Sequence, residues 1–199
     1  IVMEFVDGES CAEILRDHGP MGTRDAVNVL SQACRGLDYA HRNGVVHRDV
    51  KPGNLLRNRE GVIKLADFGI AKARTSFDPA AERHILMGKK HYMSPEQALA
   101  LAVDARSDVF TLGVVLYEML TLEPLFKEDI TDLLLDEVTV HPLPSAKSRV
   151  PHLPGEIDDV LTRALSRDPH RRPTAAAMGH ALDKWIEKQR PVPSPDRLQ

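Results

Sequence analysis

The feature that most restricts the fold of this chain is a mostly apolar stretch from Val109 to Leu120. A helix needs about 20 apolar residues to cross a bilayer. This stretch is shorter, and it contains Glu118. A helix that is apolar on nearly every face belongs in the centre of a domain. We therefore expect a domain built around one buried helix, and no membrane segment in this chain.

Length and composition agree with a single soluble domain. The chain has 199 residues, of which 42% are hydrophobic, enough for one sizeable core. The 26 basic and 29 acidic residues give a net charge of -3, which argues against a nucleic-acid or membrane-surface partner. No signal peptide is evident, and the two cysteines, Cys11 and Cys34, show no paired spacing. These features predict a cytoplasmic protein.

Apolar residues at helical spacing predict further helices. One begins at Thr23, which is placed to cap it, and ends at Asn43-Gly44. From Ser94-Pro95-Glu96 onward we expect helices only, because Ser at the cap and Pro in the first turn suit a helix start. The segment 141–154 is proline-rich and predicts an irregular connector. The periodic positions are Ala26, Val29, Leu30, Ala33, Leu37 and Ala40, then Ile157, Val160, Leu161, Ala164 and Leu165, and finally Met178, Leu182, Trp185 and Ile186.

Two regions have the pattern of β-strands. Ile1 to Phe5 is an apolar, β-prone run that Asp7-Gly8 interrupts as a turn would, so the chain starts inside an expected strand. Further along, Leu55-Leu56 and residues 62–65 flank a polar segment at 57–61. This pattern predicts a short β-hairpin.

The expected hairpin brings oxygen-bearing side chains together. If it pairs symmetrically about Glu60, Asn54 lies opposite Ala66 or Asp67, because facing strands sit about 4.8 Å apart. Asp49 precedes Asn54 by one short loop and faces the same volume. Amide and carboxylate oxygens suit a magnesium ion that carries substrate phosphates. The pattern thus favours a site for phosphoryl transfer, which needs charge neutralisation and alignment more than covalent chemistry.

Three motifs in order carry a specific resemblance. They are the segment 47–54 (His-Arg-Asp-Val-Lys-Pro-Gly-Asn), Asp67-Phe68-Gly69, and Ser94-Pro95-Glu96. The set resembles the catalytic loop, the magnesium-binding loop and the end of the activation segment of protein kinases. A lysine at position 51 resembles the catalytic loop of serine/threonine kinases, and the residues around the motifs resemble those of eukaryotic-like bacterial kinases. The implied fold is the kinase C-terminal lobe, mainly α-helical with a small β-hairpin at the active site.

The resemblance implies roles for individual residues. Asp49 would orient the substrate hydroxyl and accept its proton, and Lys51 would steady the moving phosphoryl group. Asn54 and Asp67 would hold Mg²⁺. By the same resemblance, Met3 would be the gatekeeper residue of the hinge. The backbones of Glu4 and Val6 would form hydrogen bonds with the adenine of ATP, and Leu56 would form the floor of the adenine site.

Other polar residues resemble residues that have a structural role in the family. His47 is expected to pack against Phe68, and Asp108 to bind backbone amides of the catalytic loop. Glu96 and Arg172 resemble a buried ion pair that joins the activation segment to the last helices. We expect these residues to support the site without taking part in chemistry. The histidines His84 and His91 lack the spacing of a zinc site.

The sequence departs from the family pattern at two places. No glycine-rich phosphate loop occurs, so we expect a fragment with hinge and C-lobe at residues 1–190, an absent N-lobe, and a disordered Pro-rich tail at 191–199. The fragment alone is expected to be inactive. Lys89 stands where serine/threonine kinases usually have Thr, and it can pair with Asp49 and occupy the base.

An arginine directly before the catalytic aspartate, as Arg48 stands before Asp49, resembles the pattern of kinases whose activation segment is ordered by phosphorylation. Thr75 and Ser76 are the nearest candidate acceptors. The predicted function of the parent enzyme is ATP-dependent phosphorylation of Ser/Thr residues in a protein substrate. A pseudokinase or truncated lobe that acts as a docking module is one alternative, and a small-molecule phosphotransferase is another. Phe68-Gly69 and the Ser94-Pro95-Glu96 segment argue against the second.

Overall fold

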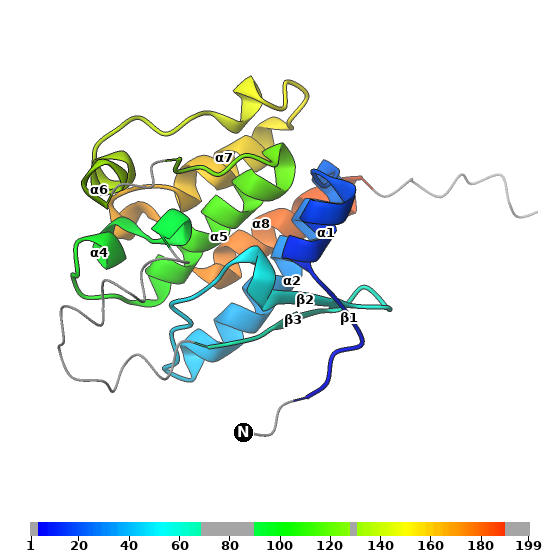
Figure 1. Ribbon diagram of the computed structural model, residues 1–199. Coiled ribbons are helices and arrows are strands. Elements are labelled where there is room, and N and C mark those ends of the chain that lie inside the picture. The colour runs from blue at the N-terminus through cyan, green and yellow to red at the C-terminus, as the bar shows by residue number, and fades with distance from the viewer. Residues whose placement is uncertain (1–3, 69–89, 128–130, 190–199) are drawn as a thin grey trace, which may run out of the picture.

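The computed structural model describes residues 4–68, 90–127 and 131–189, and most of these residues lie in helices (Figure 1). A small sheet lies beside the helices, close to the first described residues. The strands are β1 (Gly8–Ser10), β2 (Leu55–Asn58) and β3 (Ile63–Leu65). The α-helices are α1 (Cys11–His18), α2 (Thr23–Arg42), α4 (Pro95–Ala98), α5 (Ala105–Thr121), α6 (Thr131–Thr139), α7 (Gly155–Ala164) and α8 (Ala175–Lys188).

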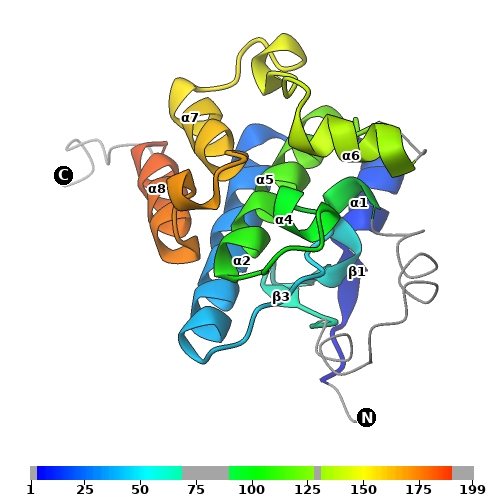
Figure 2. The ribbon, with the colours of Figure 1, turned by 90° about the vertical axis from the view of Figure 1, so that its left-hand side faces the viewer.

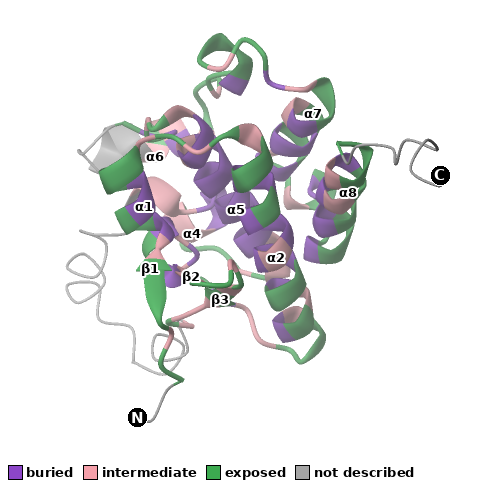
Figure 3. Cartoon of the chain, turned by 90° about the vertical axis from the view of Figure 1, so that its right-hand side faces the viewer, coloured by how far each residue is buried: buried purple, intermediate pink, exposed green. Residues whose placement is uncertain are grey.

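Helix α5 is the centre of the molecule, as its apolar sequence predicts. It is buried on nearly all sides, whereas α2 and α8 each have one exposed face (Figure 3). Helices α2, α7 and α8 pack against it. A Cβ atom at Gly113 would lie 2.9 Å from Leu165, so this glycine lets the end of α7 approach closely. No helix in the described part of the chain is long and apolar enough to span a membrane.

Helix α2 lies along α8 and carries the sheet at its other side (Figure 1). Its predicted extent is confirmed, since it ends at the C-cap Asn43. The prediction that Thr23 caps it is wrong. Gly22 has the extended conformation that precedes a helix, with φ -58° and ψ 146°, so Thr23 is already the first helical residue. No side chain caps this end.

The sheet is antiparallel, with strand order β1-β2-β3. The predicted hairpin is confirmed as β2 and β3, and β1 adds a third strand. The strand expected at residues 1–5 is wrong for Glu4 and Phe5, which belong to no strand, and residues 1–3 lie outside the described part. The strand starts instead at Gly8, where a Cβ would lie 2.0 Å from the carbonyl oxygen of Arg57. Glycine is needed there for close strand pairing, not for a turn.

The sequence patterns did not predict two of the helices. Helix α1 is short, but Ser10 and Glu13 form a capping box at its start, which is a recognisable signal. Helix α6 lies beside α4, which in turn lies over α5 (Figure 2). The expected irregular connector at 141–154 is confirmed, since it holds only a short 3-10 turn at Ala146–Ser148. From Ser94 on, the described elements are all helical, as predicted.

Candidate active site

The loop from His47 to Asn54 is held by a buried carboxylate at the start of α5. Asp108 is 1% exposed, and its two oxygens accept the backbone N–H groups of His47 and Arg48, each at 2.8 Å. His41 Nε2 lies 2.8 Å from the same carboxylate. Arg48 has a left-handed backbone, with φ 63°, a conformation that needs such support. The predicted structural role of Asp108 is confirmed.

His47 joins this loop to the end of the hairpin. Its ring packs against that of Phe68 in a tilted arrangement, with 4.3 Å between centroids, which confirms the predicted contact. Its Nε2 atom lies 3.0 Å from the carbonyl oxygen of Ala66. Burial lowers the pKa of His47, although the nearby Asp108 opposes this shift. The buried ring thus serves as a fixed spacer between the two loops.

Asp49, Lys51 and Asn54 lie together in the loop. The Nζ atom of Lys51 is 3.9 Å from an oxygen of Asp49, whose side chain is 13% exposed. The amide nitrogen of Asn54 donates to the backbone carbonyl of Asp49 at 2.8 Å. This bond fixes the orientation of the buried Asn54 amide. Within the described residues nothing donates to its side-chain oxygen, which remains an acceptor for a cation.

The hairpin register brings Asp67 to the same end of the sheet. Leu55 faces Leu65, so the pairing is symmetric about residue 60, as predicted. The Ala66 N–H donates to the carbonyl oxygen of Asn54 at 2.9 Å, and Asp67 follows directly. Asp67 is exposed and has φ 55°. Left-handed backbone at non-glycine residues is costly and tends to occur where function requires it.

Hard oxygen ligands are therefore available, but few of them. Among the described residues, no three His, Cys, Asp or Glu side chains gather closely enough to hold a metal ion. Asn54 and Asp67 carry oxygen atoms of the kind that magnesium prefers, an ion that usually takes its other ligands from water and phosphate.

The residues predicted to contact adenine lie near the N-terminal end of the described chain. Glu4 and Val6 line a shallow hollow together with Asn58 and Lys64, and Glu4 forms an exposed ion pair with Lys64 at 3.3 Å. Leu56 lies in β2, between Ser10 and Lys64 of the neighbouring strands. Met3 lies outside the described residues. So do Gly69, Thr75, Ser76, His84 and Lys89.

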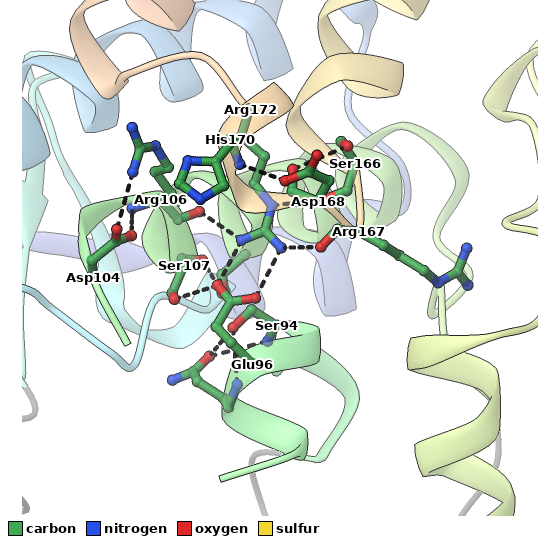
Figure 4. A network of polar contacts seen from close by, with 12 residues as sticks. Ser94, Glu96, Asp104, Arg106, Ser107, Ser166, Arg167, Asp168, His170 and Arg172 are labelled. Carbon is green, nitrogen blue, oxygen red and sulfur yellow. Dashed lines mark hydrogen bonds and ion pairs between the residues drawn. The ribbon is translucent and has the colours of Figure 1, made fainter. Parts of the chain in front are cut away.

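A second polar cluster surrounds Arg172, and Figure 4 shows it. Arg172 is fully buried and donates to both oxygens of Glu96, at 2.6 and 2.8 Å. It also donates to the backbone carbonyls of Ser166, Arg106 and Arg167. The predicted buried ion pair is thus confirmed. It connects α4, the start of α5 and the segment before α8 (Figure 4).

Sequence reasoning missed one polar support of the loop. The side chain of Gln97 donates to the carbonyl oxygen of Arg48 at 3.1 Å. Gln97 also forms a capping box with Ser94 at the start of α4. The pattern Ser-x-x-Gln marks the cap, but no sequence signal indicates the contact across 49 residues.

Comparison with known proteins agrees with this geometry. The family model described as "Protein kinase domain" matches residues 1–186. This chain belongs to the protein kinase domain family. The match ends four residues before the boundary at 190 expected from the sequence, which stays a prediction.

The kinase domain here is similar to bacterial serine/threonine kinases, which confirms the resemblance seen in the motifs. It is 41% identical over 179 residues to "Serine/threonine-protein kinase PknB" of Mycobacterium tuberculosis. It is 36% identical over 173 residues to "Probable serine/threonine-protein kinase CPE1738" of Clostridium perfringens. These matches cover 89% and 86% of this chain, but the chain spans only 28% and 25% of those relatives.

A solved structure confirms the kinase fold. Rad53 residues 1–466, crystallised in complex with AMP-PNP, superimposes on this chain with a TM-score of 0.75 and 25% sequence identity. The superposition covers 92% of this chain and 46% of that one. The expected fold class, a mainly helical kinase lobe with a small sheet, is therefore correct.

Proposed function

We propose that this chain forms the hinge and C-terminal lobe of a kinase that transfers the terminal phosphoryl group of ATP to serine or threonine residues of a protein. The observation that carries this proposal is the fixed loop around Asp49. Asp108 accepts hydrogen bonds from the backbone amides of His47 and Arg48, which precede Asp49. Asn54 donates to the backbone carbonyl oxygen of Asp49. The relatives named as serine/threonine kinases support the acceptor class.

In this proposal each loop residue has one task. Asp49 orients the acceptor hydroxyl and takes its proton, since its side chain is largely enclosed and lies beside Lys51 in the fixed loop. Lys51, at 3.9 Å from Asp49, offsets negative charge on the transferred group. The rigid loop aligns the reactants and thereby avoids the entropic cost of finding that alignment in solution.

Two further residues would hold the metal and two backbone segments the nucleotide. Asn54 and Asp67 present the oxygen atoms for Mg²⁺, which, when bound, neutralises charge on the phosphates. The backbones of Glu4 and Val6, which line the hollow beside Lys64, would bind adenine, and Leu56, which pairs with Lys64, would form its floor. The nucleotide analogue in the Rad53 complex supports ATP as the ligand. Buried, unpaired Cys11 and Cys34 support the cytoplasm as the compartment.

The test is phosphotransfer by the full-length parent protein that contains this chain, with a peptide that contains serine and threonine as the acceptor. Replacing Asp49 by Asn keeps the shape and removes the base, so the rate should fall about 10²–10⁴-fold. Replacing the exposed Asp17 by Asn should leave the rate unchanged. Equal rates for the two variants would reject the proposed role of Asp49. Wild-type protein that transfers no phosphate would reject the function and favour a docking module.

A further inference from the structure

Gln32, on α2, makes two hydrogen bonds to the outer edge of the hairpin. Its Nε2 group donates to the carbonyl oxygen of Gly61, and its Oε1 atom accepts the N–H of Ile63, both at 3.0 Å. Strand β3 is an edge of the described sheet, so these two backbone groups face no strand there. The side-chain amide of Gln32 therefore takes the place of a neighbouring strand.

Helix α2 also contacts β3 one turn further along. A Cβ atom at Gly36 would lie 2.7 Å from the side chain of Leu65. Gln32 and Gly36 are four residues apart, so they lie on the same face of the helix. The helix thus holds β3 at two points, with a polar contact at residues 61 and 63 and a close apolar contact at 65. Sliding of β3 along α2 would break both contacts.

The position of β3 sets the position of Asp67. Only Ala66 lies between the end of β3 and Asp67, and an extended chain advances about 3.3 Å per residue. Ala66 is itself bonded to Asn54 through its N–H. A shift of Ile63 along the helix is therefore passed on to Asp67 with little room for adjustment.

We propose that Gln32 is a positioning residue for the metal site: its amide fixes β3 against α2 and thereby sets where Asp67 presents its carboxylate to Mg²⁺. This inference rests on the proposed function, because it takes Asp67 as a magnesium ligand. Residues that orient a metal ligand without touching the metal typically change metal affinity or activity 10–100-fold when mutated. Gln32 does not touch Asp67, but it holds the strand that leads to Asp67, and so we expect an effect at the lower end of this range.

The experiment compares Gln32→Met with Gln189→Met in the full-length protein. Methionine has a similar length and loses both hydrogen bonds, whereas Gln189 is exposed at the C-cap of α8. We expect Gln32→Met to raise the Mg²⁺ concentration for half-maximal phosphotransfer about tenfold at saturating ATP, and Gln189→Met to leave it unchanged. Gln32→Glu keeps the acceptor for Ile63 and loses the donor to Gly61, so it should give an intermediate shift. It carries the same test if Gln32→Met does not fold.

A second measurement separates this inference from the proposed function. Binding of Mn²⁺ in the presence of ATP, followed by electron paramagnetic resonance, requires no phosphotransfer. Weaker Mn²⁺ binding by Gln32→Met supports the inference even if the wild-type protein transfers no phosphate. A variant that melts at a lower temperature but has the wild-type requirement for Mg²⁺ and wild-type Mn²⁺ binding shows a purely structural glutamine, and overturns the inference.

Discussion

Two glutamates, the buried Glu96 and the half-buried Glu118, anchor the segment between residues 91 and 98 to the core, and they do so through different partners. Glu96 pairs with the guanidinium of Arg172 and also accepts a hydrogen bond from Ser107. Glu118, on α5, accepts the hydroxyl of Tyr92 at 2.7 Å. One carboxylate therefore faces a cation, whereas the other faces a neutral phenol.

The partner decides how each glutamate titrates. Burial alone would raise the pKa of Glu96, but the hydrogen bonds from Arg172 and Ser107 outweigh it and hold the pKa below its usual range. Burial raises the pKa of Glu118, and the hydrogen bond from Tyr92 only partly opposes this. Burial and the adjacent Glu118 also raise the pKa of Tyr92. Burial thus acts in the same direction on both carboxyls, and the partners of Glu96 reverse its effect whereas those of Glu118 do not.

The difference shows which anchor depends on its partner. A buried charge without its counter-ion is costly, whereas a carboxyl that can take up a proton remains satisfied. Arg172 should therefore matter much more for folding than Tyr92 or Glu118. The guanidinium also lies 4.8 Å from the ring of Phe110, so it contributes packing as well as charge.

The largest expected effect comes from replacing Arg172 by Met, which leaves Glu96 buried without a counter-ion. We expect a loss of about 3–5 kcal/mol in the free energy of unfolding, measured by urea denaturation. The control is Arg171→Met, because the Arg171 side chain is 82% exposed and should cost less than about 1 kcal/mol. Adding Glu96→Gln to Arg172→Met should recover part of the loss, since it removes the buried charge. No recovery would mean that the packing of Arg172, and not its charge, dominates.

A smaller effect should appear in the pH dependence of stability. The folded protein holds a proton on Glu118 more tightly than the unfolded chain does, so stability falls as pH rises from the ordinary carboxyl pKa to the raised one. Glu96 acts in the opposite sense, and its contribution is lost as pH falls below the ordinary value through the lowered one.

Glu118→Gln should remove the fall in stability that Glu118 causes as pH rises. It should change the free energy of unfolding by only about 1 kcal/mol, because the Tyr92 hydroxyl keeps an acceptor. Urea denaturation between about pH 4 and pH 7 measures it. Glu187→Gln, at an exposed position of α8, is the matched control and should keep the wild-type slope. An identical slope in Glu118→Gln would show that Glu118 does not bind a proton in this range.

The smallest expected effect lies at the end of the same segment. Ala100 has φ 53°, and the N–H of Leu101 donates to the carbonyl oxygen of Glu96 at 2.8 Å, as in a Schellman cap. Glycine adopts this conformation without strain, so Ala100→Gly should stabilise the fold by about 0.5–1 kcal/mol. Ala102→Gly, at an exposed residue without positive φ, should not stabilise it. Thermal denaturation of the two variants decides, and equal shifts would contradict the assignment of strain to Ala100.

Much of the site could be predicted from the sequence because its geometry depends on local spacing. The hairpin register followed from two apolar runs about a polar turn, and it fixed the relation between Asn54 and the residues after β3. The central helix followed from its continuous apolar surface. The family motifs identified Asp108, His47 and Arg172 as supports, and the contacts of all three agree.

What could not be predicted depends on contacts between segments far apart in the chain. Gly8 looked like a turn residue in the sequence, but it lies in strand β1, where it closely approaches the backbone of Arg57. The bonds from Gln32 to the hairpin and from Gln97 to Arg48 join residues with no shared pattern. Helical periodicity reports which face of a helix is buried, but it does not report which polar group that face will meet.

The symmetric pairing of β2 with β3 makes the length of their exposed turn critical. If one residue more or fewer between Asn58 and Val62 shifted the register of β3 against β2 by one, every side chain of one strand would turn to the opposite face. The residue that follows β3 would then point away from Asn54. Surface turns usually accept changes of length, yet here natural variation should preserve residue number more strictly than residue identity.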